Sequence, residues 1–377
     1  MTDMATTAPR EPAGGPAEVL QYAGRVGALA GIALTNSLLT LATLGIYRFW
    51  GKTRLRRYLW SRITFQGDSL EYSGTGMELF IGFIVALAIL APLIGASVAI
   101  DIYYAANLTL LAVKGILQAL IILYLIPIAI YRMRRYRLTR TQWRGIRGGQ
   151  TGSSFKYGLL YLGWGFLNLL TLFIFNPYFS IKLQRFRIEN TWFGDRRLDF
   201  DGKASELMKP WLIALLLWIP TLGFSYFWYR VREFRYFVSK TRYGSLSFES
   251  ELSAVSVILI SLGFYVSLVV LIGLLGALVS VFVPGLWTMF ASMGDPNNAE
   301  MVLQETAPAI AFLVMMVVYM VLVGVLQVVI LIHPLFRVLC RSLTVKGEED
   351  FSGIGQSRQE TPSRGEGLAD ALDVGAF

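Results

Sequence analysis

Long apolar segments constrain this chain more than any other feature. A helix needs about 20 apolar residues to cross the hydrocarbon core of a bilayer. Stretches of this kind are Val26–Tyr47, Met77–Ala99, Leu108–Ile130, Tyr157–Phe179, Trp211–Trp228, Ala254–Pro284 and Pro308–Ile332. Only 16% of the residues are charged, whereas soluble domains contain about a quarter. The sequence therefore predicts an all-α polytopic membrane protein with about seven apolar segments.

The termini and the scarcity of metal-binding residues narrow the class further. Residues 1–20 and 354–377 are polar and rich in small residues, which predicts disordered tails and no signal peptide. Cys340 and His333 are the only cysteine and the only histidine, so an intrachain disulfide and a Cys/His metal centre are excluded. Phosphate-binding glycine loops and zinc-protease motifs do not occur. We therefore predict no cofactor, no metal and no enzymatic activity.

Basic residues gather at the C-terminal ends of the apolar segments. Most of the 34 Lys and Arg residues lie in Arg48–Arg62, Arg132–Arg147, Lys182–Lys209, Arg230–Arg242 and Arg337–Lys346. Loops rich in Lys and Arg stay in the cytoplasm. All five clusters, and with them the C-terminus, are therefore expected to be cytosolic. The stretches Asp101–Asn107 and Gly285–Thr306 contain no basic residue and are expected to be external.

Simple alternation of seven spans does not satisfy this charge pattern, because it places residues 182–209 on the side opposite to the other clusters. Two topologies remain. In the first, Val26–Tyr47, Tyr157–Phe179 and Trp211–Trp228 are re-entrant hairpins that enter and leave on the cytosolic side. In the second, seven ordinary spans leave one basic loop outside. The over-long segment Ala254–Pro284 is expected to tilt or to break near its glycines.

A basic and aromatic module recurs along the chain. Each copy has interleaved arginine and aromatic residues, then an aromatic residue shortly before a glycine. In three copies, a short alternating run follows. Turns such as Gly67-Asp68 and Gly194-Asp195, flanked by alternating apolar residues, predict small cytosolic β-hairpins. The copies are Phe49–Gly76, Tyr131–Ser154, Ile181–Leu207, Tyr229–Leu252 and a weaker Phe336–Gly353.

The order of these segments indicates an internally repeated membrane domain over residues 21–353. The halves would be residues 21–154 and 205–353, with an inserted module at 155–204. Repeats of this kind are common in transporters, although they also build proteins without transport activity.

Two phrases resemble the signatures of a known family. "NSLLTLATLGIYRFWGKTRLRRYLWSRITFQG" (Asn36–Gly67) and "RRYRLTRTQWRGIRGG" (Arg134–Gly149) are similar to those of the YjgN family of bacterial inner-membrane proteins, which is defined by a domain of unknown function. The resemblance spans roughly residues 21–353. It implies a multi-pass protein of the bacterial cytoplasmic membrane and no particular reaction, substrate or catalytic residue.

The arginine and aromatic residues of the modules have two interpretations. They either anchor the protein at the membrane interface or form a site for anionic lipid headgroups. The candidates are Arg54, Arg56, Arg57, Tyr58, Arg134, Arg135, Tyr136, Trp143, Arg185, Arg187, Trp192, Arg232, Arg235 and Tyr236. The sequence pI of about 9.6 also fits nucleic acid, but the topology accounts for the charge and no nucleic-acid motif occurs.

Polar residues inside the apolar segments define a second hypothesis, a path for a small solute. The candidates are Asn36, Asp101, Lys114 and Asn168. An ionisable group within a membrane helix is a functional candidate; alternatively, Lys114 extends outward or pairs with Asp101, and the two asparagines join packed helices. The sequence therefore predicts a non-enzymatic cytosolic-face platform that contacts anionic lipid or a partner, with a transporter or channel as the alternative.

Overall fold

Four long apolar helices dominate the computed structural model, which describes residues 18–282, 306–347 and 351–356. Within these ranges, the helices long and apolar enough to cross a membrane are Gly76–Tyr103, Leu108–Arg140, Ala254–Val281 and Ile310–Ser342. Very few residues in their most apolar stretches are buried inside the protein. The chain is therefore an α-helical membrane protein.

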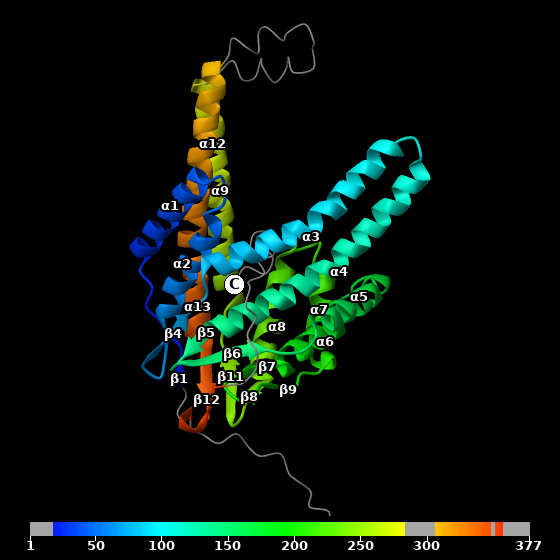
Figure 1. Ribbon diagram of the computed structural model, residues 1–377. Helices are drawn as coiled ribbons and strands as arrows, with labels where there is room; N and C mark the ends of the chain where they lie inside the picture. Colours follow the sequence, from blue (N-terminus) through cyan, green and yellow to red (C-terminus); the bar gives the residue numbers. More distant parts are fainter. Residues whose placement is uncertain (1–17, 283–305, 348–350, 357–377) are drawn as a thin grey trace, which may run out of the picture.

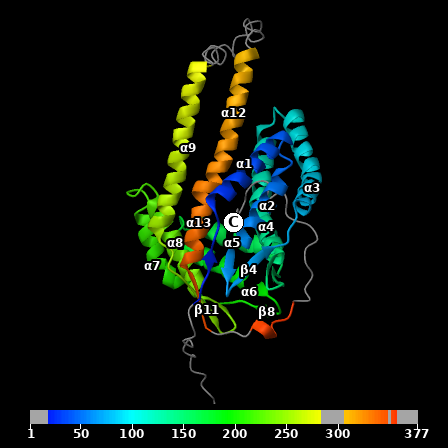
Figure 2. The same ribbon diagram turned by 90° about the vertical axis from the view of Figure 1, so that its left-hand side faces the viewer.

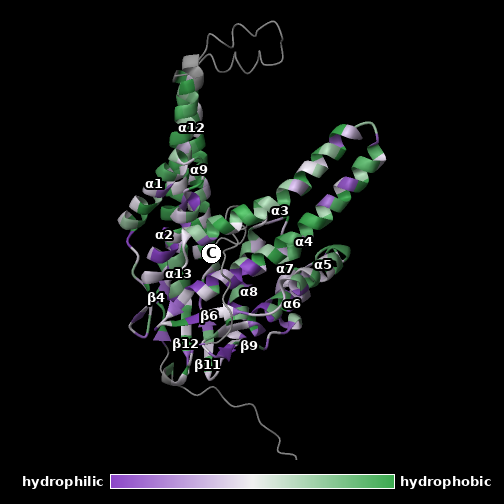
Figure 3. Cartoon of the chain, in the orientation of Figure 1, coloured by the Kyte–Doolittle hydropathy of each residue, from purple (hydrophilic) through white to green (hydrophobic). Residues whose placement is uncertain are grey.

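These helices form two long hairpins that project from the same side of the molecule (Figures 1 and 2). One consists of α3 (Gly76–Tyr103) and α4 (Leu108–Arg140). The other consists of α9 (Ala254–Phe282) and α12 (Thr306–Leu326), which continues through the π-helix Gln327–Ile332 into α13 (His333–Ser342). The projecting parts are mostly apolar and the opposite end of the molecule is mostly polar (Figure 3).

Helix α9 is unbroken at Gly273 and Gly276, so the expected break near these glycines does not occur. The expected external stretch Gly285–Thr306 lies outside the described residues except for Thr306, where α12 begins.

The other three apolar segments form pairs of shorter helices joined by tight turns, so the alternative of seven plain spans is wrong. In each pair the first helix is apolar and the second helix contains several basic residues. The pairs are α1 (Val26–Ala42) with α2 (Arg48–Ser61), α5 (Ser154–Leu170) with α6 (Asn176–Glu189), and α7 (Ala204–Leu216) with α8 (Phe224–Ser239).

Short antiparallel strands connect one helix pair to the next. They are β1 (Glu18–Val19), β2 (Gln21–Tyr22), β3 (Ile63–Phe65), β4 (Asp68–Tyr72), β5 (Thr141–Trp143), β6 (Ile146–Gln150), β7 (Thr191–Phe193), β8 (Arg196–Arg197), β9 (Asp199–Phe200), β10 (Thr241–Tyr243), β11 (Leu246–Ser250) and β12 (Leu343–Lys346). An all-helical description of the fold is therefore incomplete.

The strands of the described residues form one closed ring. The ladder orders are β1-β12-β11-β10-β9 and β2-β3-β4-β5-β6-β7-β8. Only Leu20 separates β1 from β2, and only Leu198 separates β8 from β9. The two sheets therefore share two bent strands, and the ladder returns to its start after ten strands, so that it exposes no open edge.

Apolar side chains from all around the ring meet in a single core. Phe65, Ile146, Phe193, Leu198, Tyr243, Leu246, Phe248 and Val345 pack there with Leu20, Phe351 and Ile354. Strands that are far apart in the ladder can share one cluster only across the interior of the ring. Residues 351–356 follow β12, and Phe351 and Ile354 fill this interior. Ile354 lies within the segment predicted as the C-terminal tail, residues 354–377, and β1 lies within the segment predicted as the N-terminal tail, residues 1–20.

Candidate lipid-contacting site

An arginine occupies the same position in each of four basic helices. Each guanidinium donates a hydrogen bond to a backbone carbonyl just before the next helix: Arg57 to Gly74 (2.8 Å), Arg135 to Gly152, Arg185 to Gly202 (2.8 Å) and Arg235 to Ser250 (3.0 Å). All four are among the candidates for membrane anchoring or for contact with anionic lipid headgroups. The structure gives each one a bond within the chain that joins a helix to the segment leaving the ring.

The neighbouring aromatic residues also make contacts within the chain. The Tyr58 hydroxyl accepts from the Arg25 backbone N–H at 3.0 Å, and the Tyr236 hydroxyl accepts from the Lys203 N–H at 2.6 Å. Burial raises the pKa of Tyr236 to about 12, so this hydroxyl stays protonated and also donates to the Lys203 carbonyl. Tyr136 is fully buried and donates to the Glu78 carboxylate at 2.6 Å.

The two predicted tryptophans are buried on different sides of the strand layer. Trp143 packs against Phe65, Phe193 and Phe351 at the core of the ring. Trp192 instead lies over Gly149 of β6, where a Cβ atom would be 2.0 Å from the indole. Phe193, its neighbour, is the residue that enters the core of the ring. Because both indoles are buried, they do not lie on a lipid-facing surface.

The remaining predicted arginines differ in exposure. Arg54 and Arg232 are exposed, and the Arg232 guanidinium lies 5.5 Å from the Trp228 ring centroid. Arg134 and Arg187 are half-buried, and Arg56 is buried. Arg54 and Arg232 are therefore accessible from outside the protein, as are Arg57 and Arg235, which are also exposed.

A belt of exposed cations becomes evident when positions are counted from the strands. Each member lies nine residues before the strand that follows its helix, namely β3, β5, β7 or β10. The members of this cation belt are Arg54, Arg132, Lys182 and Arg232, and all four are exposed. Sequence reasoning missed Arg132 and Lys182. Alignment of the four modules on their strands would have identified them.

The tips of the three helix pairs repeat one local structure. A threonine hydroxyl accepts from the backbone N–H four residues later, in the pairs Thr43–Tyr47 (2.9 Å), Thr171–Phe175 (3.4 Å) and Thr221–Ser225 (3.1 Å). The leucine after each threonine has a positive φ, which is uncommon outside glycine. These leucines are Leu44, Leu172 and Leu222, which are 95%, 76% and 89% exposed.

The four residues predicted to line a solute path lie in three separate places. Lys114 and Asp101 form an ion pair of 2.5 Å near the far end of the α3–α4 hairpin, as the pairing alternative predicted. Asn36 donates to the Gly51 carbonyl at 2.9 Å and ties α1 to α2. Asn168 is buried in α5, and its backbone carbonyl accepts from Phe173. The structure therefore does not bring these residues into one path.

Among the described residues, no group of three or more His, Cys, Asp or Glu side chains is placed so that it could hold a metal ion. The described residues consequently offer a surface of exposed cations, the cation belt.

Comparisons with known proteins agree with a membrane protein. The model of a family described as "Bacterial protein of unknown function (DUF898)" matches residues 17–225, more than half of the chain. "Inner membrane protein YjgN" of Salmonella typhimurium is 37% identical over 70 residues, which are 19% of this chain and 18% of that relative. The matched part is thus far shorter than either protein. No solved structure matches the chain.

Proposed function

From the premise that the chain belongs to the DUF898 family, we propose that it is a non-enzymatic platform of the bacterial inner membrane, which contacts anionic lipid headgroups through basic helices on the cytosolic side. The name of the Salmonella relative supports this location. The observation that carries the proposal is the cation belt, because four exposed cations occur at equal spacing from the ring.

The belt lies at a depth that suits the headgroup region. Nine residues of helix place each cation about 13 Å from the strands. Each exposed tip leucine precedes the belt residue of its own helix pair by ten residues. That separation is about 15 Å, half of a hydrocarbon core of about 30 Å. If the belt lies at the interface, the tips reach the middle of the bilayer.

The tips are suited to that environment. Their exposed leucines would be unfavourable in water and are favourable among acyl chains. Because backbone groups at membrane depth must be satisfied internally, the threonine hydroxyls that cap each turn are consistent with insertion. In α4 the distance from the belt residue to the far end of the helix is larger, as expected for a helix that spans the membrane. Leu108 and Arg132 are separated by 24 residues, or about 36 Å.

The chain is built, in this proposal, from five equivalent units rather than from two halves and an insert. The order strand, apolar helix, basic helix, strand occurs five times, and each unit contributes two neighbouring strands to the ring. The third module supplies β7 between β6 and β8, like any other member of the ladder. Two units carry the spanning hairpins and three carry the shorter pairs.

The topology is tested by the side on which Asp195 lies. With Cys340→Ser as background, Asp195→Cys is expected to resist a membrane-impermeant thiol reagent in intact cells and to react after permeabilisation. The reason is that Asp195 lies in the turn between β7 and β8, on the strand ring. Labelling of intact cells would place the ring outside and would overturn a cytosolic platform.

The lipid contact is tested with matched charge losses. The belt variant R54Q/K182Q/R232Q is expected to retain several-fold less anionic phospholipid on purification, because each surface cation contributes about 1 kcal/mol of attraction. The control R196Q/R197Q/R242Q removes the same charge from exposed residues of the strands. Lipid is quantified by mass spectrometry per mole of protein; equal losses in both variants would contradict the belt.

A further inference from the structure

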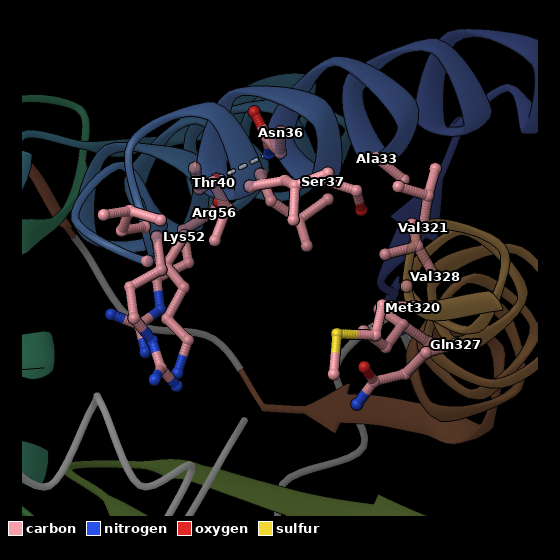
Figure 4. A pocket seen from close by; sticks show the side chains of 18 residues that line it. Ala33, Asn36, Ser37, Thr40, Lys52, Arg56, Met320, Val321, Gln327 and Val328 are labelled. Carbon is pink, nitrogen blue, oxygen red and sulfur yellow. Dashed lines mark hydrogen bonds between the residues drawn. The ribbon is translucent and has the colours of Figure 1, made fainter. Parts of the chain in front are cut away.

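A cavity of about 530 Å³ lies between the α1–α2 hairpin and α12. Lys52 and Arg56 lie on one side of it, and Met320, Val321 and Val328 lie on the other (Figure 4). Known small-molecule sites have volumes of about 300–1,000 Å³. The cavity is therefore large enough for a phospholipid headgroup and the first part of its chains.

The cavity is cationic along one wall. Arg48, Lys52 and Arg56 line it at successive intervals of four residues on α2, so they share one face of the helix. Arg48 lies six residues on the membrane side of the belt residue Arg54, a depth of about 9 Å. A cation at that depth marks a functional site by default.

The remaining walls are apolar with a few polar groups. The rim contains the exposed side chains of Leu41, Leu44 and Met320. The polar lining residues include Ser37, which is partly buried, and Gln327, which is exposed. The site thus combines a row of cations, neutral hydrogen-bonding groups and an apolar rim that faces the acyl-chain region. A soluble anion would use only the first of these features.

The fold does not require this row of cations. The positions equivalent to Arg48, Lys52 and Arg56, counted from the arginine that binds a backbone carbonyl, hold different residues in the other two helix pairs. They are Asn176, Ser180 and Gln184 in α6, and Tyr226, Arg230 and Phe234 in α8. These helices form the same hairpin with at most one cation at these positions, so the row of three cations distinguishes α2 from α6 and α8.

We propose that this cavity binds one anionic diacyl phospholipid, with the phosphate on Arg48, Lys52 and Arg56 and an acyl chain along Leu41, Leu44 and Met320. This inference rests on the proposed function, since it places the α1–α2 tip in the cytosolic leaflet. It differs from the belt in specificity: the belt attracts any anionic surface, whereas the cavity holds a single lipid.

The charge requirement is tested by titrating the full-length protein in neutral detergent with dioctanoyl phosphatidylglycerol, monitored by native mass spectrometry. R48Q/K52Q is expected to bind the lipid about 30-fold more weakly, equivalent to about 1 kcal/mol for each cation. The control R196Q/R197Q, which removes the same charge from β8, is expected to match the wild type. Equal binding by R48Q/K52Q would overturn the site.

The shape requirement is tested without changing charge. Thr40 lines the cavity, so Thr40→Trp is expected to abolish the single lipid-binding event by filling the space. Leu38→Trp is the control, because Leu38 is exposed on the same helix and is not among the cavity-lining residues. Binding by Thr40→Trp at the wild-type level would contradict occupancy of the cavity, as would an equal loss in Leu38→Trp.

Two further compounds test whether the ligand must have both a negative charge and acyl chains. Dioctanoyl phosphatidylcholine, which has no net charge, and glycerol 3-phosphate, which has no chains, are both expected to bind at least about tenfold more weakly. Equal binding of either compound would replace an anionic lipid with a general amphiphile or a soluble anion. The belt variant R54Q/K182Q/R232Q is expected still to bind one molecule of dioctanoyl phosphatidylglycerol. The proposal for the cavity and the proposal for the cation belt can therefore be contradicted separately.

Discussion

Replacement of Trp143 by alanine is expected to lower the melting temperature by on the order of 10 °C. The indole is buried where β5 faces Phe65, Phe193 and Phe351, and its Nε1–H donates to the Phe65 carbonyl at 3.3 Å. Truncation of a buried tryptophan to alanine costs about 3–5 kcal/mol. The ring depends on this contact because its core is small and receives side chains from every side.

The natural sequence provides a reporter for this measurement. Cys340, the only cysteine, is buried in α13, so a dye that fluoresces on reaction with thiols records unfolding. Trp228→Ala is the control, since Trp228 is exposed on α8. A variant W143A that melts with the control would show that the core of the ring contributes little to stability.

Glu78→Ala is expected to produce the second large effect, a destabilisation of about 2–3 kcal/mol. The carboxylate accepts two hydrogen bonds from Arg140, at 2.9 and 3.1 Å, and one from Tyr136 at 2.6 Å. These bonds join the first turn of α3 to the ring end of α4. Their loss leaves the buried Tyr136 hydroxyl without its acceptor and removes the carboxylate that faces the partly buried Arg140.

The same thiol-reactive melting experiment measures this effect. Glu78→Gln is expected to fall between the wild type and the alanine variant, because the amide can still accept from Tyr136 but carries no charge for Arg140. Glu71→Ala is the control, since Glu71 is an exposed residue of β4. Equal melting of E78A and E71A would mean that the cluster does not hold the base of the hairpin.

The sequence anticipated part of this cluster. Thr75 and Glu78 have the spacing of a helix-capping pair, and the Thr75 hydroxyl does accept from the Glu78 N–H at 3.3 Å. In contrast, no local pattern connects Glu78 with Tyr136 and Arg140, because these two residues lie about 60 positions further along the chain. That contact arises because α3 and α4 leave and re-enter neighbouring strands of the ring.

In the candidate site, too, local sequence patterns predicted some features and tertiary contacts decided the others. Interleaved arginine and aromatic residues located the basic helices, but they did not separate Arg54, a member of the cation belt, from Arg57, whose guanidinium donates to the Gly74 carbonyl. Neighbours along a helix point in different directions, so the geometry of the ring decides which of them meets the chain and which faces outward. The Lys52 side of α2 was likewise not predicted, because its partner wall on α12 is distant in sequence.

Apolar length and composition alone determined that this is a helical membrane protein, since about 20 apolar residues in succession have few stable environments other than a bilayer. The recurrence of the basic module was also visible in the residues themselves. Only the tertiary structure decided that three apolar segments fold back at Leu44, Leu172 and Leu222. It also decided that the strands close into a ring, because strand pairing depends on contacts between residues far apart in the chain, which the local patterns of a sequence do not specify.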